Sequence, residues 1–364
     1  MPFKKINVML SLSKYGIDFF YTFNQMNILV NGIGNIGTTL LQLLVRYKDL
    51  LGIDSVHALK NTTVQPWKEE ELKILQNLGI EMFDSDGKNF RPISEVENEI
   101  DYVFDCMSNG FGNKNKSWYE SLPNLKGACA QGSEKGFGKP FMSGIKETHI
   151  FSEKFVQIVS CNTHSLASLL TTFSGRELKN LKKADFVIVR RSEDLSHHER
   201  LVSANVVSRH RNPETGTHHA EDVKDMFGSI GIACNVQSSD ITTPSQLMHS
   251  VRFSIELKNA LSQEQIKSMI ANNPMVSSTK TFDSNIVFEL GRRHGFAGRL
   301  YSHCIINHNN LLFEDNGRII KGWAFVPQEG NTLISTLHAS LLQTKNNNSK
   351  EIISNIMNDL IHKT

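Results

Sequence analysis

The feature that most constrains the fold is a glycine-rich turn that separates a strand-like segment from a helical one. Residues 27–30 (Asn-Ile-Leu-Val) are typical of a buried strand, and Gly32, Gly34 and Gly37 follow it in the pattern G-x-G-x-x-G. The next apolar residues recur at helical spacing: Ile36, Leu40, Leu43 and Leu44. In this context the first glycine permits a tight turn, the second lets the backbone approach a pyrophosphate, and the third allows close helix-to-strand packing. We therefore expect a Rossmann-type βαβ unit that binds the phosphates of a dinucleotide at a helix N-terminus.

Length, charge and cysteine usage narrow the class of protein. A chain of 364 residues is longer than one hydrophobic core usually supports, so we expect two domains. The formal net charge of +2 is too small for a nucleic-acid-binding protein. The five cysteines are odd in number and form no C-x-x-C pair, which disfavours disulfides and structural zinc and favours the reducing cytoplasm. No apolar run reaches the roughly 18 residues of a membrane helix, so we expect no membrane partner. The cysteine pattern leads us to expect no metal.

Further strand-like runs divide the chain into two parts. Those of the first part alternate with helical patterns, as in a doubly wound parallel sheet, and lie at 56–59, 102–106, 128–131 and 155–160. Those of the second part indicate a mixed or antiparallel sheet with flanking helices, and lie at 186–191, 247–257, 286–290 and 319–326. We predict an α/β protein with a Rossmann-type dinucleotide-binding domain at 26–160 and an α+β catalytic domain at 161–329.

The two ends of the chain lie outside this division. Residues 330–364 contain an amphipathic helical pattern, and we expect them to pack back on the dinucleotide-binding domain. Residues 1–25 precede Met26, which is a second possible start because the strand begins there at once. We expect this N-terminal extension to be dispensable.

Lys60 bears on the choice between NAD and NADP. An NAD site usually has Asp or Glu at the end of the second strand, where it accepts hydrogen bonds from the ribose 2′-hydroxyl. Here that strand ends with Leu59 and Lys60. A lysine can pair with a 2′-phosphate, so we expect use of NADP or of both cofactors, although Lys60 is equally compatible with an ordinary solvated strand end.

Cys161 is the candidate nucleophile. It follows the strand-like run 155–160, and Leu166, Leu169 and Leu170 begin a helical pattern after it. The cysteine is therefore expected at a helix N-terminus, where the positive end of the helix dipole favours the thiolate.

Six segments carry a resemblance to a known family. They keep their order and approximate spacing from Met26 to about Pro327: 101–115 (a strand ending in Asp, then a loop with Gly and Lys), 131–135 (Q-G-S-E-K), 160–163 (S-C-N-T), 187–191 (V-I-V-R-R), 218–223 (H-H-A-E-D-V) and 247–249 (L-M-H). Together with the glycine-rich turn they resemble the archaeal-type (type II) phosphorylating glyceraldehyde-3-phosphate dehydrogenases.

The resemblance implies a role for each matching residue. It makes Cys161 the nucleophile and His249 the general base that takes a proton from the hemithioacetal as hydride leaves. Substrate contacts are assigned to Ser160, Asn162, Thr163, His218 and His219. Beside the three glycines and Lys60, dinucleotide contacts are assigned to Asn35, Ile36, Gly132, Ser133 and Arg191.

The implied reaction is the oxidation of glyceraldehyde 3-phosphate, with NADP or NAD, through a thioacyl-enzyme that inorganic phosphate releases as an acyl phosphate. The resemblance is equally compatible with the reverse reaction, and therefore with a role in glycolysis or in gluconeogenesis. The resemblance also implies a cytoplasmic homotetramer.

Two departures from the family pattern leave alternatives open. His164-Ser165 stands where the family usually has Thr-Gly, which adds bulk near the nucleophile and could alter the substrate size. A family glutamine near the nicotinamide aligns only with Lys321 or Gly322. A related semialdehyde or acyl-phosphate reductase, or a dinucleotide-binding protein without turnover, therefore remains an alternative.

Overall fold

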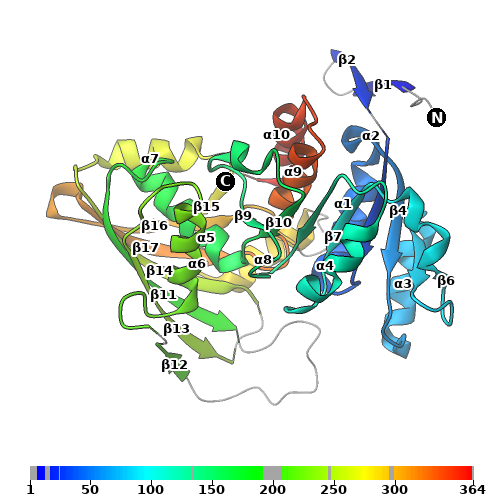
Figure 1. The fold of residues 1–364 in the computed structure, drawn as a ribbon. Helices are drawn as coiled ribbons and strands as arrows, with labels where there is room; N and C mark the ends of the chain where they lie inside the picture. Colours follow the sequence, from blue (N-terminus) through cyan, green and yellow to red (C-terminus); the bar gives the residue numbers. More distant parts are fainter. Residues whose placement is uncertain are drawn as a thin grey trace.

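The structure is a computed structural model of the 364-residue chain and describes residues 6–12, 17–23, 25–132, 134–191, 207–210, 212–244, 247–294 and 299–362. Two large β-sheets, each flanked by helices, make up most of the molecule (Figure 1). Near the N-terminus, β1 (Ile6–Leu12) and β2 (Ile17–Phe23) pair antiparallel as a two-stranded sheet of their own.

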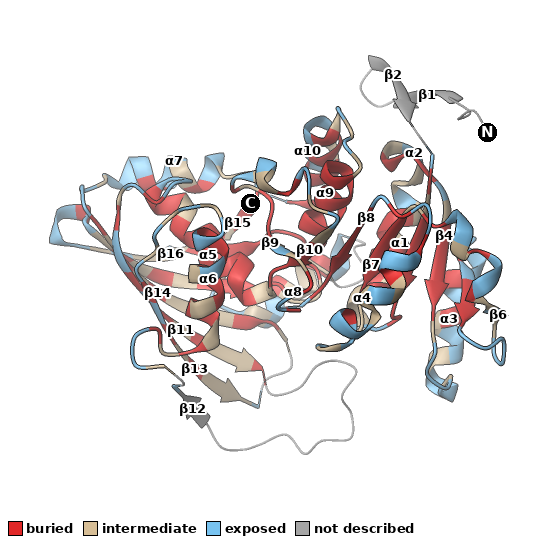
Figure 2. Cartoon of the chain, viewed as in Figure 1, coloured by how far each residue is buried: buried red, intermediate tan, exposed pale blue. Residues whose placement is uncertain are grey.

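The first sheet has eight strands, and every pair of neighbours in it is parallel. Its strands, in the order in which they lie, are β6 (Arg91–Pro92), β5 (Glu81–Asp84), β4 (Ile53–Leu59), β3 (Met26–Asn31), β7 (Tyr102–Asp105), β8 (Gly127–Ala130), β10 (Phe155–Ile158) and β9 (Lys139–Phe141). The associated helices are α1 (Asn35–Arg46), α2 (Lys48–Leu51), α3 (Glu69–Asn77) and α4 (Phe111–Ser121). All four residues of β7 and of β8 are buried, because helices cover both faces of a parallel sheet (Figure 2).

The chain order of this sheet reverses between β3 and β7. From β3 the chain proceeds outward through β4, β5 and β6, and it then returns to β7 and proceeds the other way. This reversal is the switch point at which open α/β sheets bind ligands beyond the carboxyl ends of their strands. The doubly wound parallel sheet predicted from the sequence is confirmed.

The second sheet has seven strands and is mixed, as predicted. Its strands, in the order in which they lie, are β12 (Val207–Arg209), β13 (Val236–Thr243), β11 (Leu181–Arg191), β14 (His249–Leu257), β17 (Ile319–Val326), β16 (Cys304–Glu314) and β15 (Val276–Thr279). Only β11–β13 and β15–β16 are parallel pairs. Burial alternates along β14, because one face of this sheet packs on the core and the other is more open.

Helices pack on both faces of the second sheet, and one of them replaces a predicted strand. One face carries α5 (Cys161–Ser174), α6 (His218–Gly228) and α7 (Gln263–Asn272). On the other face α8 (Ser284–Arg293) packs through Val287 against Ile305 and Phe325. The strand predicted at 286–290 is wrong, because these residues lie within α8. The Asp283 carboxylate accepts hydrogen bonds from the backbone N–H groups of Asn285 and Ile286 and caps the helix. A stretch of five residues, four of them apolar, is too short for periodicity to separate strand from helix.

The chain ends in α9 (Leu333–Gln343) and α10 (Ser349–Leu360), which lie between the two sheets in Figure 1. Apolar residues of both helices belong to the same buried cluster as β3 and α1. Every residue of α9 is buried, although it carries Ser335, Thr336, His338 and Gln343. The boundaries of the two proposed domains stay a prediction.

Candidate active site

The glycine-rich turn has the geometry that a pyrophosphate requires. Gly32 has a φ of +101°, which side-chain-bearing residues rarely adopt, and a Cβ on Gly37 would lie 1.9 Å from the carbonyl oxygen of Gly32. A Cβ on Gly34 would meet nothing within 4 Å, so the space before the helix is open. No side chain caps the N-terminus of α1. The first turn of α1 therefore fits the phosphates of a dinucleotide.

The other predicted dinucleotide contacts lie in different surroundings. The Asn35 side chain donates a 3.1 Å hydrogen bond to Glu329, and Ile36 is half-buried at the start of α1. Gly132 has a φ of +68° and open space around its Cα. Ser133 lies outside the described residues. Lys60 directly follows β4, where its ammonium donates to the Thr62 hydroxyl at 2.7 Å, and burial together with the charge of Lys68 lowers the pKa of Lys60.

Cys161 is the first residue of α5, as the sequence predicts, and it is half-buried. The preceding residue, Ser160, caps the helix by accepting a 3.2 Å hydrogen bond from the backbone N–H of Thr163. The hydroxyls of Ser160 and Thr163 also contact each other at 2.9 Å. In this arrangement both side chains hold the first turn of α5, and the helix dipole acts on the Cys161 thiol.

Asn162 and His219 meet beside the nucleophile. His219 lies in the first turn of α6, which begins at His218. The Asn162 Nδ2 atom is 3.5 Å from His219 Nδ1, and Asn162 Oδ1 is buried without a hydrogen-bond partner among the described residues. The His219 ring also contacts that of His218, with the ring centroids 3.8 Å apart and the planes tilted by 45°.

Asp240 connects His219 to a neighbouring arginine. One carboxylate oxygen of Asp240 lies 3.6 Å from His219 Nε2 and 3.2 Å from an Arg190 guanidinium nitrogen. Burial by itself would raise the pKa of Asp240, but the contacts with His219 and Arg190 outweigh it and lower the pKa. Asp240 therefore stays ionised and orients both side chains.

The ring of His249, the first residue of β14, contacts the backbone of Arg191 through Nδ1 and the side chain of Gln328 through Nε2. The backbone N–H of Arg191 donates to His249 Nδ1 at 3.0 Å. Burial, followed by the positive charges of Arg191 and Arg190, lowers the pKa of His249 well below its usual value, so the ring is neutral. Because the lone pair of Nδ1 is already occupied, the single ring proton lies on Nε2.

Gln328 completes the environment of this ring. Its side-chain Nε2 atom lies 2.6 Å from His249 Nε2, and its Oε1 atom has no hydrogen-bond partner among the described residues. Two N–H groups cannot donate to each other across this contact. With the ring proton on Nε2, the amide must be turned by 180° so that Oε1 accepts from the ring, which also gives Oε1 a partner. His249 is thus held as a hydrogen-bond donor at Nε2.

The loop at 327–332, between β17 and α9, joins the separate parts of the site. Glu329, at a φ of +64°, accepts hydrogen bonds from Asn35 at 3.1 Å and from the Arg191 guanidinium at 2.8 Å. Its second oxygen lies 3.1 Å from Arg299. Asn331 donates to the carbonyl oxygen of Cys161 at 3.0 Å. One loop therefore contacts the N-termini of α1 and α5 and, through Gln328, the ring of His249.

Sequence reasoning missed this loop. Its only local signals are turn-forming residues, Pro327, Gly330 and Asn331, between a strand and a helix. The family glutamine aligned with Lys321 or Gly322. In the structure Lys321 pairs with Glu314 and Gly322 packs against Phe253. Among the described residues, neither Lys60, which bonds to Thr62, nor Gly132, which has open space around it, contacts the other residues of the site.

The departure at 164–165 has a different consequence from the one expected. His164 and Ser165 are both fully buried, and their side chains hydrogen-bond to Ser335 and to the backbone of His303. Their bulk therefore faces the interior of the protein and does not narrow the space beside Cys161.

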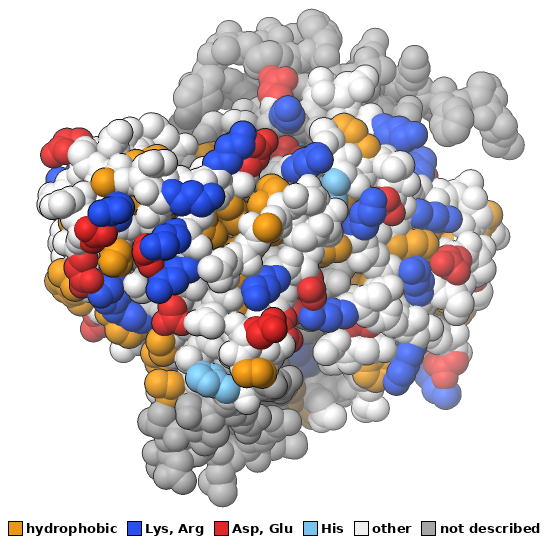
Figure 3. All heavy atoms as spheres, turned by 60° about the vertical axis from the view of Figure 1, so that its left-hand side comes forward, with side chains coloured by type: hydrophobic (Ala, Val, Ile, Leu, Met, Phe, Trp, Pro, Cys, Tyr) orange, Lys and Arg blue, Asp and Glu red, His pale blue; other side chains and the backbone are white. Residues whose placement is uncertain are grey.

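Surface and site chemistry add two observations. Among the described residues no helix is both long and apolar enough to span a membrane, and no cluster of three or more His, Cys, Asp or Glu residues could bind a metal. On the face in Figure 3, lysine and arginine side chains are interspersed with acidic and apolar ones rather than gathered in one patch.

The chain is similar in sequence to several archaeal proteins that share one name. The chain is 30% identical over 185 residues to a glyceraldehyde-3-phosphate dehydrogenase of Methanobacterium formicicum, a match that covers 50% of this chain and 52% of that protein. It is 27% identical over 272 residues to the enzyme so named from Methanobacterium bryantii (71% and 75% covered) and 25% identical over 275 residues to that of Saccharolobus solfataricus (73% and 77%). The chain thus spans about half the length of the first relative. No protein-family model matches it. The described site belongs to a chain that is similar to archaeal proteins named glyceraldehyde-3-phosphate dehydrogenase.

Proposed function

We propose that the protein is a phosphorylating glyceraldehyde-3-phosphate dehydrogenase that uses NADP or NAD and forms a thioacyl intermediate on Cys161. The observation that carries the proposal is the loop at 327–332. It hydrogen-bonds to Asn35 at the N-terminus of α1, to Cys161 at the N-terminus of α5 and to His249 on β14. A dinucleotide site, a nucleophile and an imidazole N–H are thereby joined in one site, and the similarity to the archaeal enzymes supports the same reaction.

The chain offers a fitting cofactor site. The open N-terminus of α1 and the close packing around Gly32 and Gly37 suit a pyrophosphate, and Asn35 and Arg191 would hold the dinucleotide beyond it. A nicotinamide dinucleotide, when bound there, accepts a hydride from the substrate. The preference for NADP over NAD rests on Lys60.

The nucleophile acts in three steps. The Cys161 thiolate attacks the aldehyde carbon, so that a C–S bond forms and the carbonyl oxygen becomes an alkoxide. The alkoxide then re-forms the C=O bond as the hydride leaves, which produces a thioester. Inorganic phosphate attacks this thioester, which releases the acyl phosphate and regenerates the thiolate. The dipole of α5 stabilises the thiolate at the start and at the end.

His249 serves the alkoxide as a hydrogen-bond donor. Its Nε2–H can shift from Gln328 to the developing oxyanion, while Nδ1 stays bonded to the Arg191 backbone. A general base, as expected from the sequence, would need a free lone pair on Nε2, and a ring proton on Nδ1 would then face the Arg191 N–H. The hydrogen bond from the Arg191 N–H to Nδ1 favours the donor.

The substrate contacts follow from the polar atoms near Cys161. Asn162 Oδ1 is buried and has no described partner, so it can accept a hydrogen bond from a substrate hydroxyl. His218 and His219, in the first turn of α6, suit the phosphate because a helix N-terminus attracts anions. The resemblance further supports a cytoplasmic homotetramer.

A direct assay of nicotinamide reduction tests the proposal. Purified protein is mixed with NAD or NADP, glyceraldehyde 3-phosphate and inorganic phosphate, and the absorbance of the reduced nicotinamide is followed. Rapid reduction should require both the aldehyde and phosphate. Cys161→Ser should abolish turnover and leave the dissociation constant of the cofactor nearly unchanged, because a serine hydroxyl does not ionise near neutral pH. Turnover by Cys161→Ser, or faster oxidation of a non-phosphorylated semialdehyde, would contradict the proposal.

A further inference from the structure

A buried polar network lies behind the first turn of α5, on the side away from solvent. It consists of His164 and Ser168 of α5, His303 before β16 and Ser335 of α9. Both histidine rings are fully buried, and they meet edge to face at 4.7 Å between centroids. These residues take no part in the steps proposed above.

Their hydrogen bonds run in one direction. The Ser160 carbonyl oxygen lies 3.0 Å from His164 Nδ1, so this nitrogen carries the ring proton and donates. His164 Nε2 must then accept, and it does so from the Ser335 hydroxyl at 2.9 Å. Donation along the chain therefore ends on the backbone of the helix cap.

The second histidine extends the chain outward. Ser335 Oγ uses its only proton in the hydrogen bond to His164, so its oxygen accepts from His303 Nε2 at 3.4 Å and from the Ser143 backbone N–H at 3.0 Å. His303 Nδ1 then accepts from the Ser168 hydroxyl at 3.0 Å. Each ring uses one nitrogen as donor and the other as acceptor, which only a neutral imidazole can do.

Protonation of the rings agrees with this pattern. Burial lowers the pKa of His164 to about 4, and burial together with His164 lowers that of His303 well below its usual value. Both rings are therefore neutral at physiological pH. A fully satisfied buried network of this kind fixes one arrangement of the groups that it joins.

The backbone carbonyl of His303 provides a second hydrogen-bonded connection to the first turn of α5. Its carbonyl oxygen accepts hydrogen bonds from the Ser165 hydroxyl at 2.7 Å and from Asn331 Nδ2 at 3.0 Å. The same Asn331 nitrogen donates to the carbonyl oxygen of Cys161. The carbonyls of Ser160 and Cys161 flank the Cα atom that carries the thiol. The first is linked to His303 through His164 and Ser335, and the second through Asn331.

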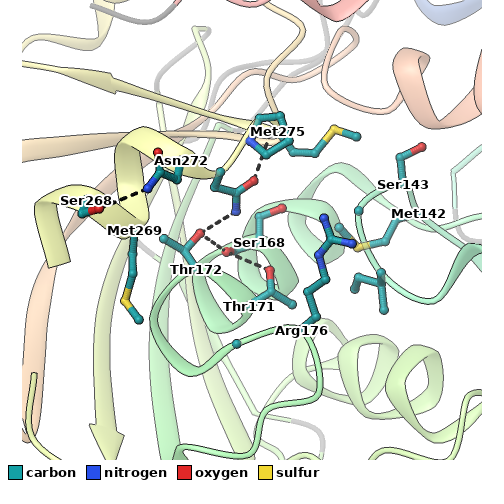
Figure 4. Close-up of a pocket in the computed structure, with 15 residues that line it drawn as sticks. Met142, Ser143, Ser168, Thr171, Thr172, Arg176, Ser268, Met269, Asn272 and Met275 are labelled. Atoms are coloured by element: carbon teal, nitrogen blue, oxygen red, sulfur yellow. Dashed lines mark hydrogen bonds between the residues drawn. The ribbon is translucent and has the colours of Figure 1, made fainter. Parts of the chain in front are cut away.

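The outer end of the network reaches a cavity. Ser143 and Ser168 line a space of about 310 Å³ between α5, α7 and the segment at 142–145, and Arg176 also lines it (Figure 4). The network therefore extends from this cavity, through the protein, to the first turn of α5.

We propose that the Ser168–His303–Ser335–His164 network positions the first turn of α5 and so sets the direction in which the Cys161 thiol points. This inference rests on the proposed role of Cys161 as the nucleophile. His164, His303 and Ser335 are positioning residues, because they act on the thiol only through the backbone of residues 160 and 161.

A matched pair of serine variants in α9 tests the network. Ser335→Ala removes the central hydroxyl, whereas Ser340→Ala removes a buried hydroxyl whose one partner among the described residues is the Leu337 carbonyl of its own helix. The readouts are the rate of Cys161 alkylation by iodoacetamide across pH, located by mass spectrometry, and kcat and KM. Ser335→Ala should lower the alkylation rate and kcat by about tenfold, as a misdirected reacting group does, with little change in KM. Ser340→Ala should match the wild type.

Two variants of His164 provide a second comparison should Ser335→Ala fail to fold. His164→Asn keeps an N–H near the Ser160 carbonyl, whereas His164→Leu does not. The asparagine variant should recover most of the alkylation rate that the leucine variant loses. Equal rates in both, or a Ser335→Ala variant as reactive as Ser340→Ala, would overturn the positioning role. If wild-type Cys161 reacts no faster than the other four cysteines, the proposed nucleophile itself is wrong and the network has no function in positioning it.

Discussion

The ring of His249 shows how one backbone hydrogen bond can decide the chemistry of a side chain. The Arg191 N–H occupies Nδ1, and this leaves a proton on Nε2 and no free lone pair on the neutral ring. The sequence indicates a histidine in this position, but it does not reveal which nitrogen is protonated.

We predict that His249→Leu lowers kcat by roughly 10²- to 10³-fold, the usual effect of removing one oxyanion donor. His249→Asn should lose less, because its amide retains an N–H. Since the pKa of His249 is well below 6.5, the ring is neutral from pH 6 upward. The pH dependence of kcat should therefore have the same shape near pH 6.5 in the wild type and in His249→Asn. An inflection there in the wild type alone, with equal losses in both variants, would support a general base instead.

Lys60 is the residue on which cofactor preference depends. An ammonium at the end of β4 can pair with a 2′-phosphate, whereas a carboxylate would repel it. We predict that NADP binds at least as tightly as NAD, and that Lys60→Asp shifts the ratio of dissociation constants toward NAD by on the order of tenfold, or about 1.4 kcal/mol.

The comparison requires both dissociation constants at one salt concentration, because salt screens exposed charges. Lys73→Asp, an exposed lysine of α3, makes the same change of charge and serves as the control. If the wild type strongly prefers NAD and Lys60→Asp changes neither constant, Lys60 lies outside the ribose pocket.

At the scale of elements, three helix N-termini converge on the site. Asn35 of α1 contacts Glu329, Cys161 of α5 contacts Asn331, and Asn162 of α5 contacts His219 of α6. Each N-terminus carries partial positive charge on its unpaired backbone N–H groups. Together they favour the anions of the proposed reaction, which are the thiolate, the cofactor phosphates and the substrate phosphate.

The N-terminal extension can be tested as an element. β1 and β2 form their own sheet, and the eight-stranded sheet begins with β3 at Met26. We predict that deletion of residues 1–25 leaves the circular dichroism spectrum, the thermal midpoint and kcat/KM unchanged within error. Loss of soluble protein on truncation would show that the extension stabilises the fold.

At the scale of the whole molecule, buried neutral histidines make stability depend on pH. His164, His303 and His338 are buried, and burial lowers the pKa of each. In the unfolded chain they take up protons below about pH 6.5, whereas in the folded protein they do not. The unfolded state then binds more protons, so stability falls as pH falls from 6.5 toward 4, the folded pKa of His164.

We predict that denaturant midpoints fall between pH 7 and pH 5. For His164 alone the loss at pH 5 is about 2 kcal/mol, from 1.36 kcal/mol for each pH unit below 6.5. His164→Gln should give a shallower pH dependence, and His210→Gln, at an exposed position, should leave the slope unchanged. The same slope in all three proteins would mean that other groups govern the acid sensitivity.

The sequence by itself determined the features that depend on neighbouring residues. The glycine-rich turn, β17 at its predicted bounds of 319–326 and the helix beginning at Cys161 all arise from local spacing and backbone geometry. A G-x-G-x-x-G turn, for example, is recognisable because the steric requirements of its glycines lie within six residues.

Only the tertiary structure decided how these features combine. The strand predicted at 286–290 became part of α8, because a cap at Asp283 and burial of Val287 favour a helix that the short apolar run does not distinguish. The hydrogen bond from Asn35 to Glu329 joins residues 294 positions apart, and that from Asn331 to Cys161 spans 170. No local pattern contains such pairs. They form because packing of α9 between the two sheets brings the loop before it to both helix N-termini, and burial then requires each polar atom to find a partner.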